Sequence, residues 1–157
     1  MRIGMGYDSH RFAPERPLIL AGVRIEHELG LSGHSDADVA AHAVIDAICG
    51  AAGLGDIGTL FPDSDEQYRA ADSCQLLAET VARARRKGWT PINCDLTIIT
   101  ETPRLGPHKG AMRKNLAELL GLDAAAVSVK AKTNEKMGFV GRREGMAAMA
   151  AVLLGPV

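Results

Sequence analysis

The pattern of hydrophobic and polar residues divides the first third of the chain into strands followed by a helix. Residues 2–12 and 18–25 have the alternation of strands, and the turn at 14–17 between them, with a proline at each end, predicts a hairpin. A glycine-containing loop covers 29–35. Residues 37–52 then show the spacing of a helix, and a glycine follows its last residue.

The rest of the chain alternates between helix and strand. Helical spacing covers 71–87 and 107–120, and each of these segments is followed by a glycine. Residues 89–100 and 127–133 alternate as strands. Residues 145–154 are ambiguous, because their alanines and methionines favour a helix while a final Val-Leu-Leu suits a buried strand. Composition alone favours the helix.

The composition indicates one compact domain spanning residues 1–157. The chain is 46% hydrophobic and 24% charged, and it contains no repeat or linker. Its net charge of -1 and aromatic content of 4% are unlike those of nucleic-acid-binding proteins, which are usually basic and richer in aromatic residues. No apolar run approaches the ~20 residues that span a bilayer, and a signal peptide is not evident at the N-terminus. Cys49, Cys74 and Cys94 lie in apolar segments and are expected to be buried free thiols, which indicates a cytoplasmic protein.

The polar residues at the start of the first helix carry candidate chemistry. Ser35 and Asp36 are expected to cap this helix. One stripe of the helix then bears three polar side chains at positions i, i+4 and i+8, namely Asp38, His42 and Asp46. This stripe is predicted to face a functional site.

A second pair of polar residues lies on the first strand. Asp8 and His10 are two positions apart and therefore point to one face of the strand. Together with His42 they form an Asp/His/His set that suits Zn²⁺ with an open position for a substrate oxygen. The alternative is that these residues are structural hydrogen-bonding groups. Asp38 and Asp46 either orient a ligand imidazole or are exposed helical carboxylates.

Three polar loops supply further candidates. The segment 129–142 combines cations and glycines with Thr133 and Glu135, which suits a diphosphate with Mg²⁺ or, alternatively, an ordinary solvated loop. The carboxylates of 56–65 suit polyol hydroxyls or a divalent cation, with a calcium loop as the runner-up. The loop 100–106 precedes a helix N-terminus, where backbone amides commonly receive anions or base edges.

Several motifs in one order carry a family resemblance over essentially the whole chain. They are Gly-Tyr-Asp-Ser-His-Arg-Phe at 6–12, Gly-His-Ser-Asp-Ala-Asp at 33–38 with His42, Asp-Ile-Gly at 56–58, Phe-Pro-Asp-Ser-Asp at 61–65 and Thr-Asn-Glu-Lys-Met-Gly-Phe at 133–139. The chain resembles the 2-C-methyl-D-erythritol 2,4-cyclodiphosphate synthases. Agreement of separate motifs is far more specific than any one of them.

The resemblance implies an α+β fold, a single compact domain with a mixed four- or five-stranded sheet and helices packed on one face. It implies a homotrimer whose sheets pack around an axis, with active sites between subunits, and it makes 145–154 a strand. The implied activity is that of a phosphorus–oxygen lyase in non-mevalonate isoprenoid precursor biosynthesis. The enzyme converts 4-diphosphocytidyl-2-C-methyl-D-erythritol 2-phosphate to the 2,4-cyclodiphosphate and CMP. Such a transfer needs positioning and charge stabilisation and no strong base.

The resemblance also implies roles for individual residues. The ligands of Zn²⁺, or of another divalent transition metal, would be Asp8, His10 and His42, and Glu135 would hold Mg²⁺ or Mn²⁺ with the substrate diphosphate. His34 and Thr133 would stabilise the transition state. The substrate contacts outside the nucleotide pocket would also include Asp8, His10, His34, Ser35, Asp56, Ile57, Gly58, Phe61, Asp63, Asp65 and Glu135.

A neighbouring subunit is implied to supply the cytidine diphosphate pocket from Thr100, Pro103, Arg104, Leu105, Gly106, Ala131, Lys132 and Thr133. Arg104 replaces an expected lysine, and Lys132 stands where threonine is also familiar, so the phosphate geometry can differ in detail. Phe139 and Arg142 fall where the family lines a cavity on the trimer axis, which in some members holds an isoprenoid diphosphate.

Two other functions compete with the synthase. One is a trimeric module that binds a nucleotide or an isoprenoid diphosphate and uses zinc structurally. A structural zinc site normally has four protein ligands, and no cysteine lies near Asp8, His10 or His42 in the sequence pattern to supply the fourth. The other is a zinc hydrolase, for which His34 is the one candidate base.

Overall fold

The computed structural model describes residues 1–157 and contains one five-stranded sheet, one two-stranded hairpin and five α-helices. The strands are β1 (Arg2–Ala13), β2 (Leu18–Leu20), β3 (Val23–Ile25), β4 (Gly30–Leu31), β5 (Trp89–Ile99), β6 (Val127–Lys132) and β7 (Gly145–Pro156). The α-helices are α1 (Val39–Ala52), α2 (Ile57–Leu60), α3 (Ser73–Arg86), α4 (Lys109–Leu120) and α5 (Gly138–Gly141), with short 3-10 turns at Glu66–Tyr68, Gly106–His108 and Ala124–Ala126. None of the helices has both the length and the apolar character needed to cross a membrane.

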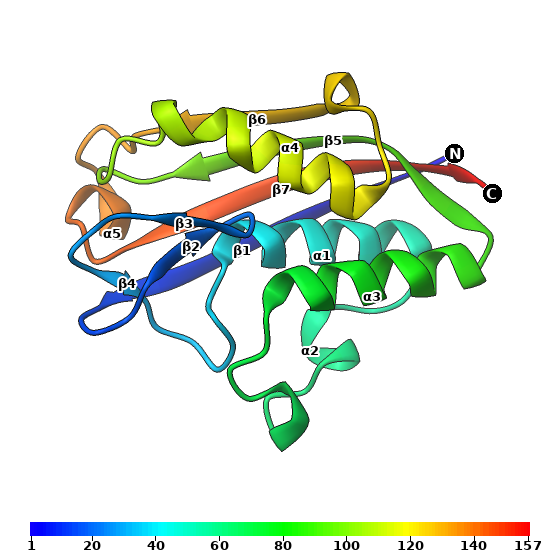
Figure 1. The fold of residues 1–157 in the computed structure, drawn as a ribbon, viewed down its shortest axis with the longest axis horizontal. Coiled ribbons are helices and arrows are strands. Elements are labelled where there is room, and N and C mark those ends of the chain that lie inside the picture. The colour runs from blue at the N-terminus through cyan, green and yellow to red at the C-terminus, as the bar shows by residue number, and fades with distance from the viewer.

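The strand order of the large sheet is β4-β1-β7-β5-β6. Only β5 and β6 run parallel, and the other three pairs are antiparallel. The helices α1, α3 and α4 lie on the same side of this sheet, and both chain ends lie at one end of it (Figure 1). The predicted α+β class, the mixed sheet and the helices on one face are therefore confirmed.

The predicted hairpin between residues 2–12 and 18–25 is wrong. The second segment divides into β2 and β3, which pair with each other and not with β1. The division occurs at Ala21 and Gly22, which both have positive φ angles, 50° and 74°, as a two-residue hairpin turn between twisted strands requires. The neighbours of β1 are β4 and the distant strand β7.

Residues 145–154 form part of β7, so the helix that composition favours is wrong and the strand implied by the resemblance is confirmed. This strand lies in the middle of the sheet and pairs with β1 on one side and β5 on the other. Met146, Ala148 and Ala150 point inward and are buried, whereas Met149 is 40% exposed. Pairing with a strand on each side and close packing against α1 override the helix propensity of alanine.

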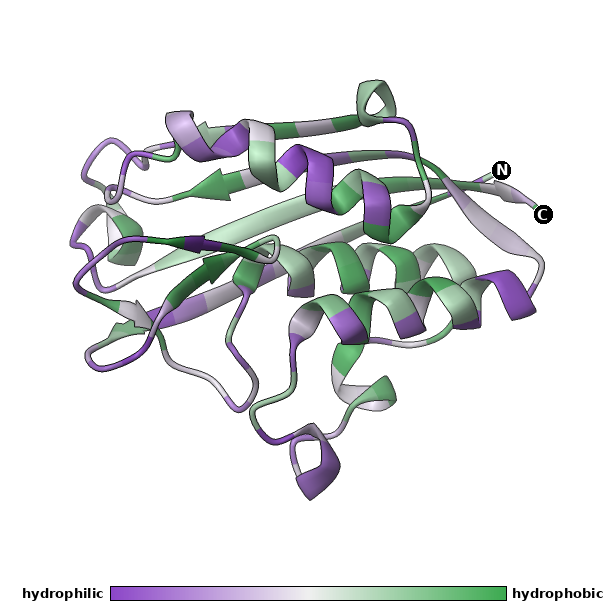
Figure 2. Ribbon diagram, viewed as in Figure 1, coloured by the Kyte–Doolittle hydropathy of each residue, from purple (hydrophilic) through white to green (hydrophobic).

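Helix α1 is the centre of the hydrophobic core. It packs against β1, β7 and α3, and Figure 2 shows it as hydrophobic along most of its length, whereas α3 and α4 carry polar residues on one side. Cys49 and Cys94 are buried free thiols as predicted, but Cys74 is only half-buried.

The close approach of α1 to β1 depends on two glycines of the strand. A Cβ atom added to Gly4 would overlap the carbonyl oxygen of Ala47, and one added to Gly6 would overlap that of Ala43. Because both obstacles are helix backbone, they cannot move aside as a flexible side chain can. The sheet and the helix can therefore meet at this distance only where β1 has no side chain.

We expect Gly6→Ala to lower the free energy of unfolding by about 3 kcal/mol, because the methyl group must push α1 away from the sheet. Gly50→Ala is the matched control, since Gly50 lies in α1, the helix that packs on Gly6, and a Cβ atom added there would meet only open space. That change should stabilise the protein by roughly 0.5 to 1 kcal/mol through helix propensity. Urea unfolding followed by circular dichroism measures both, and equal effects of the two changes would contradict this account of the packing.

Candidate active site

The helix that carries His42 begins at Val39, two residues later than the sequence suggests. The N-cap of α1 is Asp38, and neither Ser35 nor Asp36 caps it. The carboxylate of Asp38 is fully buried and accepts hydrogen bonds from the backbone N–H groups of Ala40 and Ala41. It also accepts from Ala21 and Gly22 at the β2–β3 turn, so one side chain fixes the start of α1 to this hairpin. Burial raises the pKa of the Asp38 carboxyl, although the hydrogen bonds from Ala41, Gly22 and Ala21 favour its charged form.

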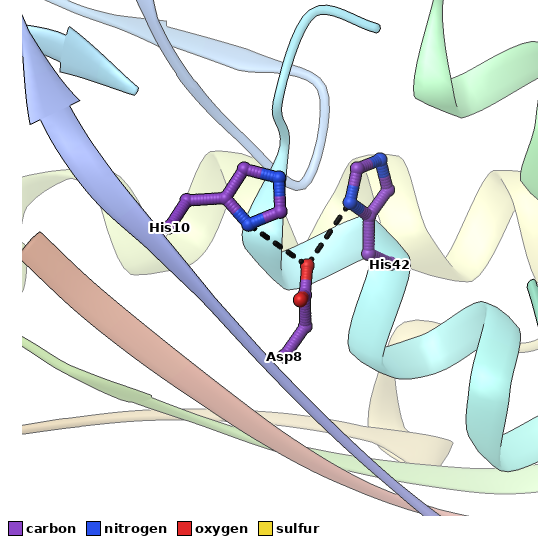
Figure 3. Close-up of side chains that lie close together, drawn as sticks. All are labelled: Asp8, His10 and His42. Carbon is purple, nitrogen blue, oxygen red and sulfur yellow. Dashed lines mark hydrogen bonds and ion pairs between the residues drawn. The ribbon is translucent and has the colours of Figure 1, made fainter. Parts of the chain in front are cut away.

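The predicted Asp/His/His group is present. Asp8 and His10 point from β1 toward the first turn of α1, and His42 points from that turn toward them (Figure 3). The Nδ1 atoms of His10 and His42 lie 3.1 Å and 3.0 Å from the same Asp8 oxygen, Oδ2. One donor atom from each of the three residues lies within 4.8 Å of the other two, so the group can hold a metal ion.

The chemistry of this group fits a divalent transition metal. One carboxylate oxygen and two imidazole nitrogens are typical ligands of such ions. The Nδ1 atom of His10 is buried and has no partner in hydrogen-bonding geometry, despite its charge contact with Asp8. A bound cation would satisfy this nitrogen.

The electrostatics of the centre favour a carboxylate facing positive charge. Burial by itself raises the pKa of Asp8, but the close contacts of its carboxylate with the imidazoles of His10 and His42 outweigh burial and lower the pKa to about 2. Burial lowers the pKa of His10, and the Asp8 carboxylate outweighs this effect and leaves the pKa raised. A carboxylate beside two imidazoles attracts a cation, and binding of a metal ion would displace any proton from the ligand nitrogens.

The hypothesis that Asp38 or Asp46 orients a ligand imidazole is wrong. Asp38 is occupied by backbone donors, and the Oδ1 atom of Asp46 accepts from the N–H of Ile57 at 2.8 Å. The far nitrogen of His42, Nε2, instead lies 2.9 Å from the hydroxyl of Ser73 and 3.2 Å from that of Ser35. The sequence does not indicate this role for Ser73, because a serine at the start of a helix gives no distinctive signal.

A cavity of about 250 Å³ opens beside the metal ligands. The predicted substrate residues that line it are Asp8, His10, His34, Ser35, Ile57, Gly58, Phe61 and Asp63. Tyr68 and Leu76 line it as well and were not predicted. The aromatic rings of Phe61 and Tyr68 pack edge to face, with their centroids 5.3 Å apart. Together they form an apolar part of the cavity wall.

Two of the predicted carboxylates do not line this cavity. Asp56 caps α2 by accepting from the N–H and hydroxyl of Thr59. Asp65 caps the turn Glu66–Tyr68 by accepting from Gln67. Both carboxylates are needed locally because each satisfies backbone donors at the start of a helical turn.

The residues predicted for the nucleotide lie around a different cavity, of about 430 Å³, at the ends of β5 and β6. Its lining comprises Thr100, Glu101, Pro103, Arg104, Leu105, Gly106, Pro107, Ala131, Lys132 and Thr133. No residue lines both this cavity and the one beside the metal ligands. Within a single chain, the structure therefore does not bring the two groups of predicted substrate residues together.

The loop after β6 is held by Glu101. Its Oε1 atom accepts from the N–H groups of Asn134 and Lys136, on either side of Glu135. The carboxylate of Glu135 is exposed and accepts from the Thr133 hydroxyl at 2.9 Å, apart from the group formed by Asp8 and the two histidines. Phe139, on α5, is 38% exposed. Nearby, Arg142 donates to Glu144 at 2.7 Å.

The fold and this site define an α+β protein with a three-residue metal centre in the wall of a polar cavity. The chain belongs to the YgbB family, whose model matches residues 1–155.

Individual relatives agree with this assignment. The chain is 56% identical over 153 residues to 2-C-methyl-D-erythritol 2,4-cyclodiphosphate synthase of Bordetella petrii, covering 98% of this chain and 94% of that protein. Among solved structures it is similar to the bifunctional IspDF from Campylobacter jejuni, with a TM-score of 0.95 and 47% identity over 99% of this chain and 42% of that one. It is also similar to a 2C-methyl-D-erythritol-2,4-cyclodiphosphate synthase in a CDP-bound form, with a TM-score of 0.91 and 38% identity over 98% of this chain and 100% of that one.

Proposed function

We propose that this protein converts 4-diphosphocytidyl-2-C-methyl-D-erythritol 2-phosphate to 2-C-methyl-D-erythritol 2,4-cyclodiphosphate with release of CMP. The 2-phosphate oxygen forms a bond to the β-phosphorus as the bond from that phosphorus to the oxygen of CMP breaks. The proposal is carried by the convergence of Asp8, His10 and His42 in the wall of a polar cavity, in a chain of this family. This reaction makes the protein a phosphorus–oxygen lyase, with one catalytic domain over residues 1–157.

Zinc is the metal proposed for Asp8, His10 and His42. Three protein ligands of nitrogen and oxygen type are the set that catalytic zinc sites use, and none of the three cysteines belongs to this group. When bound, the metal would draw charge from diphosphate oxygens. The attacking phosphate is already an anion, so the remaining residues need to position groups and not to remove a proton.

His34 and Thr133 are the residues proposed to contact the reacting phosphates. The Nε2 atom of His34 is buried and has no hydrogen-bond partner within the chain, and His34 lines the cavity beside the metal ligands. A buried polar atom of this kind is available to a substrate oxygen. Ile57, Gly58 and Asp63, which line that cavity, are proposed to contact the methylerythritol unit. The same role is proposed for Asp56 and Asp65. Glu135, with its exposed carboxylate, is proposed to hold Mg²⁺ or Mn²⁺ with the diphosphate.

The nucleotide is proposed to bind in the cavity of Thr100–Gly106 and Ala131–Thr133 of a neighbouring subunit in a homotrimer. Two observations support this. The two cavities share no lining residue, and the face of β1 away from α1 is apolar and uncovered, with Ile3, Met5 and Tyr7 exposed by 75%, 73% and 51%. Exposed apolar surface on this scale commonly marks an interface. Phe139 and Arg142 are proposed to line an axial cavity of the trimer that admits an isoprenoid diphosphate. The protein is also proposed to act in the cytoplasm.

Turnover of the diphosphocytidyl substrate with Zn²⁺ and Mg²⁺, followed by ³¹P NMR, tests the function. We expect CMP and a cyclic diphosphate in equal amounts. CMP with an open-chain product would indicate a zinc hydrolase, and tight nucleotide binding without turnover would indicate a binding module. Either result would overturn the synthase assignment.

A further inference from the structure

The far side of His42 is held by a short chain of hydrogen bonds that ends at Asp36. Ser73, the first residue of α3, is fully buried, and its hydroxyl lies between the Nε2 atom of His42 and the Oδ1 atom of Asp36. Asp36 lies in the loop before α1 and also accepts from the N–H groups of Ser73 and Asp38. Three segments that are distant in sequence thus meet behind one metal ligand.

The direction of these hydrogen bonds follows from the number of protons available. The Asp36 carboxylate acts as an acceptor toward two backbone N–H groups, so the short contact with Ser73 needs the hydroxyl proton of the serine. The Ser73 oxygen then faces Nε2 of His42 at 2.9 Å with only lone pairs to offer. This contact is favourable when Nε2 carries a proton, and repulsive when it does not.

Ser35 does not reverse this assignment. Its hydroxyl oxygen lies farther from Nε2, at 3.2 Å, and already accepts from the N–H of Ala37. It can act as the second, weaker acceptor of a bifurcated hydrogen bond from the same Nε2–H group. If Ser35 donated to a bare Nε2 instead, the closer Ser73 contact would have no proton in it.

We propose that Ser73 and Asp36 are positioning residues that keep the proton of His42 on Nε2, so that His42 binds the metal through Nδ1. The Nδ1 atom is the one that faces Asp8. The inference rests on the metal centre of the proposed function and does not depend on the cyclisation reaction. Here the Ser73 hydroxyl connects the Asp36 carboxylate to the imidazole of His42 through a relay of two hydrogen bonds. Metal-binding histidines more commonly contact an outer carboxylate or carbonyl directly.

The surrounding backbone fixes this relay in place. The N–H of Asp36 donates to the carbonyl of Ala71 at 3.1 Å, and the N–H of Ala70 donates to the carbonyl of His34 at 2.9 Å. The start of α3 is therefore bound to the loop that leads into α1 by main-chain contacts independent of the Ser73 hydroxyl. Removing that hydroxyl should leave the two segments together, which makes Ser73→Ala a usable variant.

Two readouts on the purified protein test the proposal without the substrate. With ¹⁵N-labelled protein and ¹¹³Cd²⁺, we expect cadmium coupling to Nδ1 of His42 and a slowly exchanging proton on its Nε2. Competition titration with a zinc chelator should show that Ser73→Ala and Asp36→Asn bind Zn²⁺ about 10- to 100-fold more weakly than the unaltered protein. Ser128→Ala, an exposed serine of β6, is the control and should bind Zn²⁺ normally.

Cadmium coupling to Nε2 of His42, or unchanged zinc affinity in both Ser73→Ala and Asp36→Asn, would overturn the proposal. A merely structural role predicts a lower melting temperature with the Nε2 proton retained, which the same spectra detect. Normal relay signals in a protein that forms no cyclic diphosphate would contradict the proposed function alone.

Discussion

Replacing His42 by alanine is expected to lower formation of the cyclic diphosphate by about 1,000-fold, which corresponds to roughly 4 kcal/mol of transition-state stabilisation. The change removes one of three metal ligands and leaves the Asp8 carboxylate with a single imidazole beside it. Initial rates of CMP release measure the effect, and zinc content of the purified variant shows whether the metal is lost with it.

The control for this change is His108→Ala, because His108 lines neither the cavity beside the metal ligands nor the nucleotide cavity. It should retain full activity and zinc. Since His42 is buried, thermal unfolding of both variants is needed to separate loss of the site from loss of the fold. A folded His42→Ala variant with full activity would rule out the metal mechanism.

Co-expression of two inactive variants is expected to restore about a quarter of the activity, because each site would draw its two cavities from different subunits. One variant is His42→Ala, and the other carries Arg104→Glu with Lys132→Glu, which places negative charge where the nucleotide phosphates are expected. In a randomly mixed trimer a site has an even chance of an intact metal centre and an independent even chance of an intact neighbouring nucleotide cavity. The product of the two chances is about one quarter.

The same two variants purified separately and then mixed, without subunit exchange, provide the control and should stay inactive. Two different affinity tags isolate the co-assembled trimers, each of which has one intact site, so their activity should be about one third of that of the unaltered trimer. Co-assembled trimers that remain as inactive as either parent would show that both cavities of one site belong to the same chain, contrary to the proposed arrangement.

Much of the site could be predicted because it depends on local periodicity. The two-residue spacing of Asp8 and His10 places both on one face of an extended strand, and His42 follows a polar segment into a helix. Their joint use as a metal centre was only a hypothesis from spacing, and the agreement of several motifs with one family strengthened it. The errors arose where long-range contacts compete with local preference, as at residues 145–154, whose two neighbouring strands come from distant parts of the chain.

The partners of His42 show the same limit. Asp38 and Asp46 share its helical stripe, but Asp38 is used to cap the helix and Asp46 binds the N–H of Ile57. Ser73, which is 31 positions away in sequence, reaches Nε2 because α3 packs beside α1. No local pattern encodes that approach.

The sequence by itself therefore determined that Asp8 and His10 share one face of a strand and that His42 lies on a helix, because periods of two and 3.6 residues fix the face on which a side chain lies. The tertiary structure decided that these side chains meet. Gly4 and Gly6 let the backbone of α1 come close to β1, and this contact brings His42 to Asp8 and His10. Such a distance depends on packing between two elements, and the periodicity of either element alone contains no information about it.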